Sequence, residues 1–301
     1  MTTVSRDLRF LDPGVIARLG TMELKARTVV EGFLSGLHRS PYRGFSVEFA
    51  EYRQYLPGDD LGTLDWKVYA RSDRHYVKKF EEETNLECHL LLDRSASMAY
   101  RGGAPMSKLE YGSVLAASLA FLMNRQRDAT GLITFDEQIR FRMPAAARPG
   151  HLHALLLALE RLEPGERSDV GRPLHQLAEA LVKRSLIVVI SDLLDDPEPV
   201  VKGLRHLKAR GTDVVVFQVL DPHELTFPFT GSARFTDVET EDVVIADPSR
   251  ARTDYLRELA TLTLRYDREL RGVGIDYVQL DTSQPLDFAL LRYLSARGRR
   301  P

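Results

Sequence analysis

Beyond residue 79 the sequence alternates short apolar runs with longer amphipathic stretches, and this alternation limits the possible folds more than any other feature. Apolar residues dominate residues 86–92, 129–135, 185–190, 213–220 and 275–280. Such runs are typical of strands that are buried on both faces of a parallel sheet. Helical patterns lie between most of them, at residues 108–126, 151–162, 173–183, 199–210 and 252–271. Right-handed crossovers place helices on both faces of the sheet, so the sequence predicts an α/β fold with a doubly wound, mainly parallel, Rossmann-like sheet.

The N-terminal part follows a different pattern. Residues 14–38 carry apolar side chains at helical spacing, which predicts one amphipathic helix before Pro41. Residues 42–79 are rich in turns and aromatic side chains, with a strand candidate at residues 48–55. We therefore expect a helix and a turn-rich β subdomain over residues 1–82, and a larger domain over residues 83–301.

Two further segments of the larger domain are expected to form strands outside the alternating pattern. Residues 138–143 are expected to return as a hairpin from the second strand. Residues 226–247 contain Pro, Gly and Thr and interrupt the alternation, which predicts a β-rich insertion.

Composition excludes several classes of function. Lys and Arg number 41 against 43 Asp and Glu, so no large net charge draws the chain to nucleic acid or to an anionic membrane. Cys88 is the only cysteine, which rules out an internal disulfide and a cysteine-based zinc site. No stretch approaches the roughly 20 apolar residues that span a bilayer. We expect a cytoplasmic protein without membrane insertion and without a nucleic-acid partner.

Oxygen-bearing side chains gather where the strands of the predicted sheet end, which is where open parallel sheets bind ligands. Asp93, Ser95 and Ser97 follow the first apolar run, Asp192 follows the third, and Ser168 lies in a loop before a helix. A small hard cation takes about six oxygen ligands near 2.1 Å and retains several waters. The serines can coordinate directly, and the two carboxylates directly or through water. The sequence thus predicts a divalent-cation site, for Mg²⁺ first, although Mn²⁺ and Ca²⁺ suit the same oxygens.

The charge of this ligand set points to recognition rather than catalysis. Two carboxylates and three neutral hydroxyls leave a divalent ion short of negative charge, so an Asp or Glu of another protein would complete its coordination. We expect a protein-binding site and no enzymatic activity.

The spacing of these residues resembles the metal-ion-dependent adhesion site of von Willebrand factor A domains. That resemblance rests on Asp93-x-Ser95-x-Ser97, on Ser168 followed by Asp169, and on Asp192 after an apolar strand. The second loop of that family usually carries Thr, where this sequence has Ser168. Serine keeps the ligand oxygen but lacks the methyl group that stiffens threonine.

Motifs before the metal loop are similar to those of the bacterial "domain of unknown function 58" (DUF58) proteins. They are Gly44-Phe45-Ser46-x-Glu48-Phe49, Arg53-x-Tyr55-x-x-Gly58-Asp59-Asp60, Asp65-Trp66 and Ala70-Arg71. The resemblance implies a partnership with a MoxR-type AAA+ ATPase, as partner or adaptor of an ATP-driven chaperone in the assembly or maturation of protein complexes. Many relatives carry transmembrane helices, and this sequence departs from them by having none.

Two other functions remain open from the residues alone. A metal-dependent phosphohydrolase of the haloacid dehalogenase type also places Asp after its first strand, but it normally carries a second Asp two residues later, where this chain has Ser95. A metal-free scaffold with a vestigial site is the other alternative, and Ser168 is the only hint of it.

Other polar residues near the site have simpler roles. Asp195 and Asp196 are expected to cap the helix that begins near Pro197. His151 and His153 are expected to lie on the surface.

Overall fold

The computed structural model describes residues 12–39, 52–54, 76–78, 87–181, 184–231, 233–236, 243–287 and 289–291. Contacts divide the chain into two compact units, residues 1–36 with 86–301 and residues 37–85. This grouping differs from the expected boundary at residue 82, because the N-terminal helices belong to the larger unit. In the smaller unit the structure describes β1 (Tyr52–Gln54) and β2 (Tyr76–Lys78), which pair antiparallel. Most of the motif residues between 44 and 71 lie outside the described residues.

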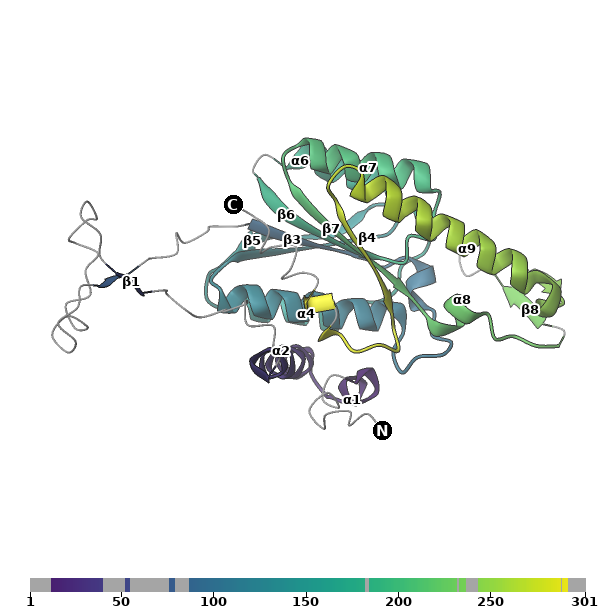
Figure 1. Ribbon diagram of the computed structural model, residues 1–301, viewed down its shortest axis with the longest axis horizontal. Coiled ribbons are helices and arrows are strands. Elements are labelled where there is room, and N and C mark those ends of the chain that lie inside the picture. Colours follow the sequence, from purple (N-terminus) through teal and green to yellow (C-terminus); the bar gives the residue numbers. More distant parts are fainter. Residues whose placement is uncertain are drawn as a thin grey trace. The chain divides into compact units, whose positions relative to one another are not determined.

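The larger unit is built on a six-stranded sheet (Figure 1). Its strand order is β10-β7-β6-β3-β4-β5, with the bounds β3 Glu87–Asp93, β4 Ala129–Phe135, β5 Ile139–Ala146, β6 Ser185–Ser191, β7 Asp213–Leu220 and β10 Asp276–Asp281. Every neighbouring pair is parallel except β4 and β5. The predicted α/β fold with a mainly parallel sheet is confirmed, and so is the hairpin return after the second strand.

Helices cover both faces of this sheet (Figure 1). One face carries α6 (Gly171–Ala180), α7 (Pro197–Ala209) and α9 (Pro248–Arg271), whose apolar side chains share a core with β6 and β7. The other carries α4 (Lys108–Arg125), and α5 (His151–Glu160) packs against α4 and β4. All seven residues of β6 are buried, as its continuous apolar run predicts.

The N-terminal segment forms two helices instead of the single predicted one. Helix α1 (Pro13–Ala17) is followed by α2 (Met22–Arg39). Gly20 favours a break between them, and the Thr21 hydroxyl accepts a hydrogen bond of 3.2 Å from the amide of Leu24, which caps the new helix. On the apolar face of α2, Val29 and Val30 are fully buried. This burial explains why the helix belongs to the larger unit.

The segment 226–247 contains a β-hairpin, as its composition predicts. Strands β8 (Ala233–Thr236) and β9 (Val243–Ala246) pair antiparallel, after the short helix α8 (Pro222–Thr226). The ring of Phe227 lies 5.7 Å from that of Phe235 and 4.7 Å from that of Tyr255 on α9, measured between centroids. Aromatic packing thus joins α8, the hairpin and the first half of α9.

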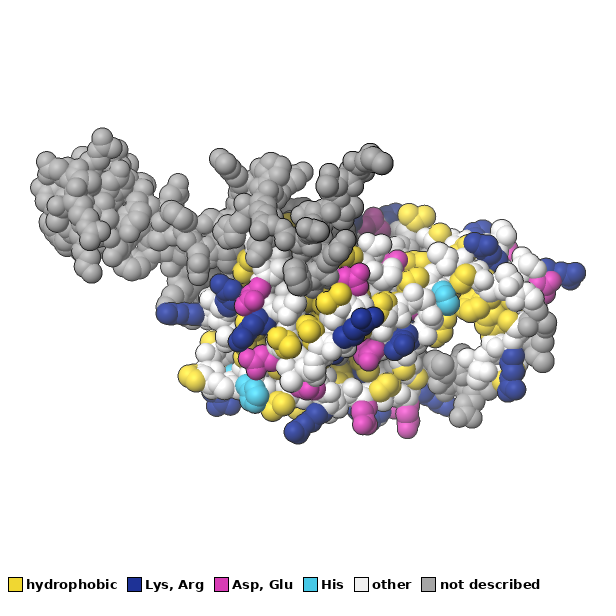
Figure 2. Space-filling model, turned by 90° about the horizontal axis from the view of Figure 1, so that it is seen from below, with side chains coloured by type: hydrophobic (Ala, Val, Ile, Leu, Met, Phe, Trp, Pro, Cys, Tyr) yellow, Lys and Arg dark blue, Asp and Glu magenta, His cyan; other side chains and the backbone are white. Residues whose placement is uncertain are grey.

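Charged side chains of both signs are interspersed over the described face of the molecule that Figure 2 shows. This distribution agrees with the near balance of acidic and basic residues. Among the residues that the structure describes, no helix has the length and apolar character needed to cross a membrane.

Candidate functional site

Asp93 ends β3 and is completely buried at the edge of the sheet where the parallel strands finish. Its Oδ1 accepts a hydrogen bond of 2.8 Å from the amide of Ser95, and its Oδ2 accepts one of 2.6 Å from the Ser191 hydroxyl. Burial and the negative charge of Asp192 raise the pKa of Asp93 to about 7, although the bonds from Ser191 and Ser95 favour the ionised form. Among the described residues this carboxylate is stabilised by hydrogen bonds and forms no ion pair of its own.

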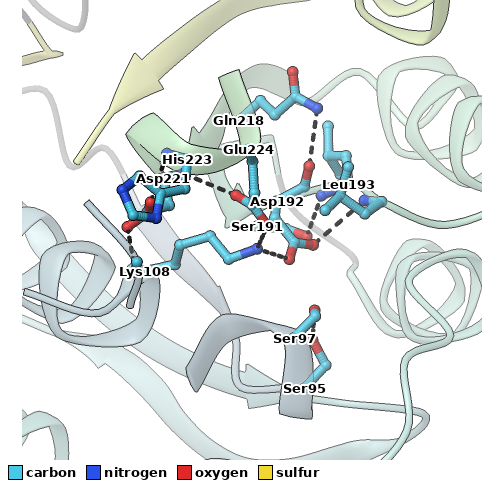
Figure 3. Close-up of polar contacts among 12 residues, drawn as sticks. Ser95, Ser97, Lys108, Ser191, Asp192, Leu193, Gln218, Asp221, His223 and Glu224 are labelled. Atoms are coloured by element: carbon cyan, nitrogen blue, oxygen red, sulfur yellow. Dashed lines mark hydrogen bonds and ion pairs between the residues drawn. The ribbon is translucent and has the colours of Figure 1, made fainter. Parts of the chain in front are cut away.

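Ser95 and Ser97 lie on the turn that follows Asp93, and Ser97 belongs to the 3₁₀ helix η3 (Ala96–Ala99). Their hydroxyl oxygens are 3.2 Å apart. Adjacent ligands of an octahedral ion with bonds of about 2.1 Å are separated by about 3.0 Å. The two hydroxyls thus have the spacing of neighbouring ligands, and in Figure 3 they lie on the side of Ser191, at the end of β6, and of Asp192, which follows it.

Asp192 follows β6 and is almost completely buried. Its Oδ2 lies 2.7 Å from Nζ of Lys108, and its backbone carbonyl accepts a hydrogen bond of 2.9 Å from the Gln218 side chain. The expected second carboxylate is therefore at the site, but it is already bound to a cation of the chain itself. The sequence analysis treated Asp192 as free to bind a divalent cation and did not predict its ion pair with Lys108.

Lys108 is the first residue of α4 and has no solvent exposure. Besides Asp192, its ammonium lies 2.5 Å from Oε1 of Glu224 on α8 (Figure 3). Burial disfavours the charged form, but Asp192 and Glu224 outweigh it and raise the pKa of Lys108 above its usual value. The sequence signal for this residue was the pattern Ser107-x-x-Glu110, a capping box that places Lys108 in the first turn of a helix.

Ser168 lies half-buried in the loop that separates α5 from α6. Backbone hydrogen bonds hold this loop against the loop that follows β3: the amide of Gly165 donates to the carbonyl of Arg94 at 2.5 Å, and the amide of Ala96 donates to the carbonyl of Glu166 at 2.9 Å. The amide of Val170 donates to Oδ2 of Asp195 at 3.0 Å, which ties the same loop to the end of β6. Ser168 thus sits on a segment that is fixed to both neighbouring loops.

The two expected caps have separate roles. Asp196 caps α7, since its side chain accepts a hydrogen bond of 3.1 Å from the amide of Glu198, as predicted. Asp195 accepts from the amides of Val170, at the start of α6, and of Asp196, but from no amide of α7 itself, so its predicted role as a cap of α7 is wrong.

The prediction for the histidines of α5 is wrong for one of the two. His151 is buried, with Nε2 2.7 Å from the carbonyl oxygen of Thr130, because the start of α5 packs against β4. His153 is exposed, as predicted.

The donor chemistry of the site fits a hard cation. Within the described residues, no three His, Cys, Asp or Glu side chains form a group that could hold a metal. Asp93, Ser95, Ser97 and Asp192 meet at one edge of the sheet, with Ser168 on an attached loop, so hydroxyl oxygens must complete any ligand set. Hard cations accept such oxygens, whereas softer metals prefer nitrogen and sulfur.

Comparisons with known proteins identify the relatives of the chain. An uncharacterized protein of Mycobacterium tuberculosis, Rv1480, is 30% identical over 293 residues, which cover 96% of this chain and 91% of that protein. The uncharacterized protein YeaD of Bacillus subtilis is 41% identical over 51 residues, 17% of this chain and 13% of that protein.

A solved structure, the conserved hypothetical protein BatB from Bacteroides thetaiotaomicron, has a TM-score of 0.47 at 18% identity and covers 71% of this chain and 99% of its own. The family model described as "Protein of unknown function DUF58" matches residues 51–263. With that match and the relative in Mycobacterium tuberculosis, the chain belongs to the DUF58 family.

Proposed function

We propose that the chain is a non-enzymatic protein-binding module whose site recognises an acidic residue of its partner through a divalent cation. The observation that carries the proposal is the pair of hydroxyls of Ser95 and Ser97, 3.2 Å apart beside the buried carboxylate of Asp93. The two hydroxyls can hydrogen-bond to each other, but a buried carboxylate needs a cation, a proton or hydrogen-bond donors to compensate its charge.

The chain's own residues would divide the work at such a site. Ser95 and Ser97 present neutral oxygens for direct coordination. Asp93 is held by Ser191 and by the amide of Ser95, and each of its oxygens keeps a further lone pair for a bound water or for the ion. A divalent cation, when bound, supplies the positive charge that an incoming carboxylate requires.

The lysine changes the charge balance that the sequence predicted. Lys108 neutralises much of Asp192, so the site offers less negative charge to an ion than two free carboxylates would. An Asp or Glu from a partner then adds the missing charge. This supports Mg²⁺, Mn²⁺ or Ca²⁺ that binds saturably but weakly to the chain alone and more tightly together with a partner.

We propose further that the larger unit is a von Willebrand factor A-type domain. The doubly wound sheet, the antiparallel edge strand β5 and the site at the ends of β3 and β6 support this assignment. The partner class that we propose is a MoxR-type AAA+ ATPase or an acidic client of it, which is what the DUF58 resemblance implies.

A pull-down from the native organism with Mg²⁺ or with EDTA tests the proposal. We expect EDTA to weaken the complex by the strength of a buried charge contact, on the order of 2–5 kcal/mol, or tens to thousands of fold in affinity. Equal capture of the partner under both conditions, and by the Ser97→Ala protein, would show that recognition does not pass through a metal.

The phosphohydrolase alternative lacks support at the position that matters. Two residues after Asp93 the chain has Ser95, a hydroxyl that cannot serve as the carboxylic general acid. Lys108 is committed to Asp192 and Glu224 and is fully buried, so it is poorly placed to clamp a phosphate.

A further inference from the structure

Burial and the helix dipole both disfavour a cation at the position of Lys108, and only two neighbouring carboxylates favour it. Its side chain has no exposure to solvent, and it stands at the first position of an 18-residue helix, where the helix dipole is positive. Asp192 and Glu224 provide its compensating charges, at 2.7 and 2.5 Å. The two carboxylates therefore share one ammonium, and a change at either alters what the other receives.

Glu224 connects this ammonium to a separate element, helix α8. Its Oε1 binds Lys108, while its Oε2 accepts a hydrogen bond of 2.8 Å from the amide of Asp221 and so closes the capping box of α8. Asp221 in turn accepts hydrogen bonds of 3.0 and 2.9 Å from the amides of Gly102 and Gly103, in the loop that leads to α4. Helix α8 is thus attached to the region before and at the start of α4 through two carboxylates.

We propose that Lys108 couples the occupation of Asp192 to the attachment of α8. A cation at Asp192 competes with the ammonium for that carboxylate, so Lys108 interacts more strongly with Glu224 and α8 is held more firmly. The coupling is reciprocal: a partner that draws Glu224 away leaves Lys108 to Asp192 and weakens cation binding by the same factor. The inference rests on the proposed function for its trigger, and on the ion pairs alone for the coupling.

A change in the attachment of α8 would next affect the elements that follow it in the chain. Phe227 follows α8 and packs against Phe235 of the hairpin and Tyr255 of α9. Phe227 also has a φ of 46°, a left-handed conformation that a bulky residue keeps only when its surroundings enforce it. A change in the hold on α8 therefore acts on the packing of the β8–β9 hairpin.

Hydrogen exchange at the amides of α8, measured without metal, tests the coupling directly. Asp192→Asn removes the competing charge, and we expect slower exchange at the amides of residues 223–227. Lys108→Met removes the ammonium alone, whereas Glu224→Gln removes the charge that it binds and also alters the capping-box bond from the amide of Asp221. We expect exchange at residues 223–227 to be faster by about tenfold in Lys108→Met, the loss of one hydrogen bond to a charged group, and by at least as much in Glu224→Gln. Glu269→Gln removes a carboxylate of α9 that is paired with Arg205 of α7 and Arg265 of α9; it is the charge-matched control and should leave α8 unchanged.

Whether exchange becomes slower or faster in each variant shows whether Lys108 couples Asp192 to α8 or only stabilises the fold. Unchanged or faster exchange in Asp192→Asn would overturn the proposal. Unchanged exchange in Glu224→Gln would overturn it as well. Glu224→Gln is nearly isosteric, so it keeps the test valid if Lys108→Met does not fold. Added Mg²⁺ should slow α8 exchange in the wild type and not in Glu224→Gln. A wild type indifferent to Mg²⁺, with the Asp192→Asn effect intact, would contradict the proposed function and leave the coupling supported.

Discussion

The Ser191 hydroxyl, at the end of β6, donates a hydrogen bond of 2.6 Å to Oδ2 of Asp93, at the end of the neighbouring strand β3. The end of β6 thereby fixes the orientation of the carboxylate at the end of β3. Ser191→Ala should lower the free energy of unfolding by about 1–3 kcal/mol at pH 8, because a buried carboxylate oxygen loses its donor. Urea denaturation measures this.

Ser185 provides the matched control on the same strand. It is buried, and its hydroxyl has no hydrogen-bond partner among the described residues. Ser185→Ala should therefore change stability by no more than about 0.5 kcal/mol. Equal losses in the two variants would mean that the contact between Ser191 and Asp93 contributes nothing specific.

Asp221 should contribute more to stability than an ordinary helix cap. Its carboxylate accepts from the amides of Gly102, Gly103 and His223, at 3.0, 2.9 and 2.8 Å, and it is fully buried. Asp221→Ala is expected to cost about 2 kcal/mol or more, whereas Asp247→Ala, at the exposed cap of α9, should cost about 1 kcal/mol. Thermal denaturation of both variants checks the difference, and equal costs would show that the contacts to Gly102 and Gly103 add no stability.

His89 should make the protein sensitive to acid. It is buried on β3, and burial lowers its pKa below 6.5. The unfolded chain therefore takes up a proton as the pH falls through 6.5 while the folded chain does not, so stability is lost below that pH, down to the lowered folded pKa, by at most about 1.4 kcal/mol per pH unit.

His89→Leu should flatten this dependence. The test is the urea midpoint between pH 7.5 and pH 5.5, with His153→Leu, at an exposed position, as the control. A slope that persists unchanged in His89→Leu would place the acid sensitivity in another group.

Turnover of phosphate esters should be absent. With Ser95 in the place of a general acid, the Mg²⁺-loaded protein is expected to release no more phosphate from p-nitrophenyl phosphate than Asp93→Asn does. Metal-dependent release that disappears in Asp93→Asn would favour the hydrolase alternative.

The sheet was predictable because its signal is local. Each of the five parallel strands is a continuous apolar run that begins and ends within about one residue of the predicted range, β6 at Ser185–Ser191 for example. The edge strand β5, which is not such a run, ends at Ala146, three residues beyond the predicted range of 138–143. The break between α1 and α2 depends on Gly20 and on one cap at Thr21, a signal that the apolar spacing of residues 14–38 conceals.

The site was predictable only in part. The end of a strand follows from a short sequence pattern, whereas the partners of an ion pair can lie far apart in the sequence. Asp93, Ser95, Ser97 and Asp192 follow from the positions of two strand ends. Lys108 and Glu224 come from α4 and α8, separated by 116 residues, and no pattern in the sequence connects them. The prediction that His151 lies on the surface was wrong for the same reason, since its partner Thr130 lies on a strand 21 residues away in the sequence.

The central claim is that Ser95 and Ser97, with Asp93, hold a divalent cation. Asp93 is too deeply buried to give a clean test, because its replacement would also free the Ser95 amide and the Ser191 hydroxyl. Ser97 is half-buried and its hydroxyl faces that of Ser95, so Ser97→Ala removes one ligand with little effect on the fold.

Calorimetric titration of Mg²⁺ and Mn²⁺ into the wild type, Ser97→Ala and the exposed control Ser249→Ala measures the claim directly. We predict saturable binding of one ion to the wild type and to Ser249→Ala, and binding weaker by about tenfold or more in Ser97→Ala. No saturable binding of either ion to the wild type, or equal affinity in all three proteins, would contradict the account.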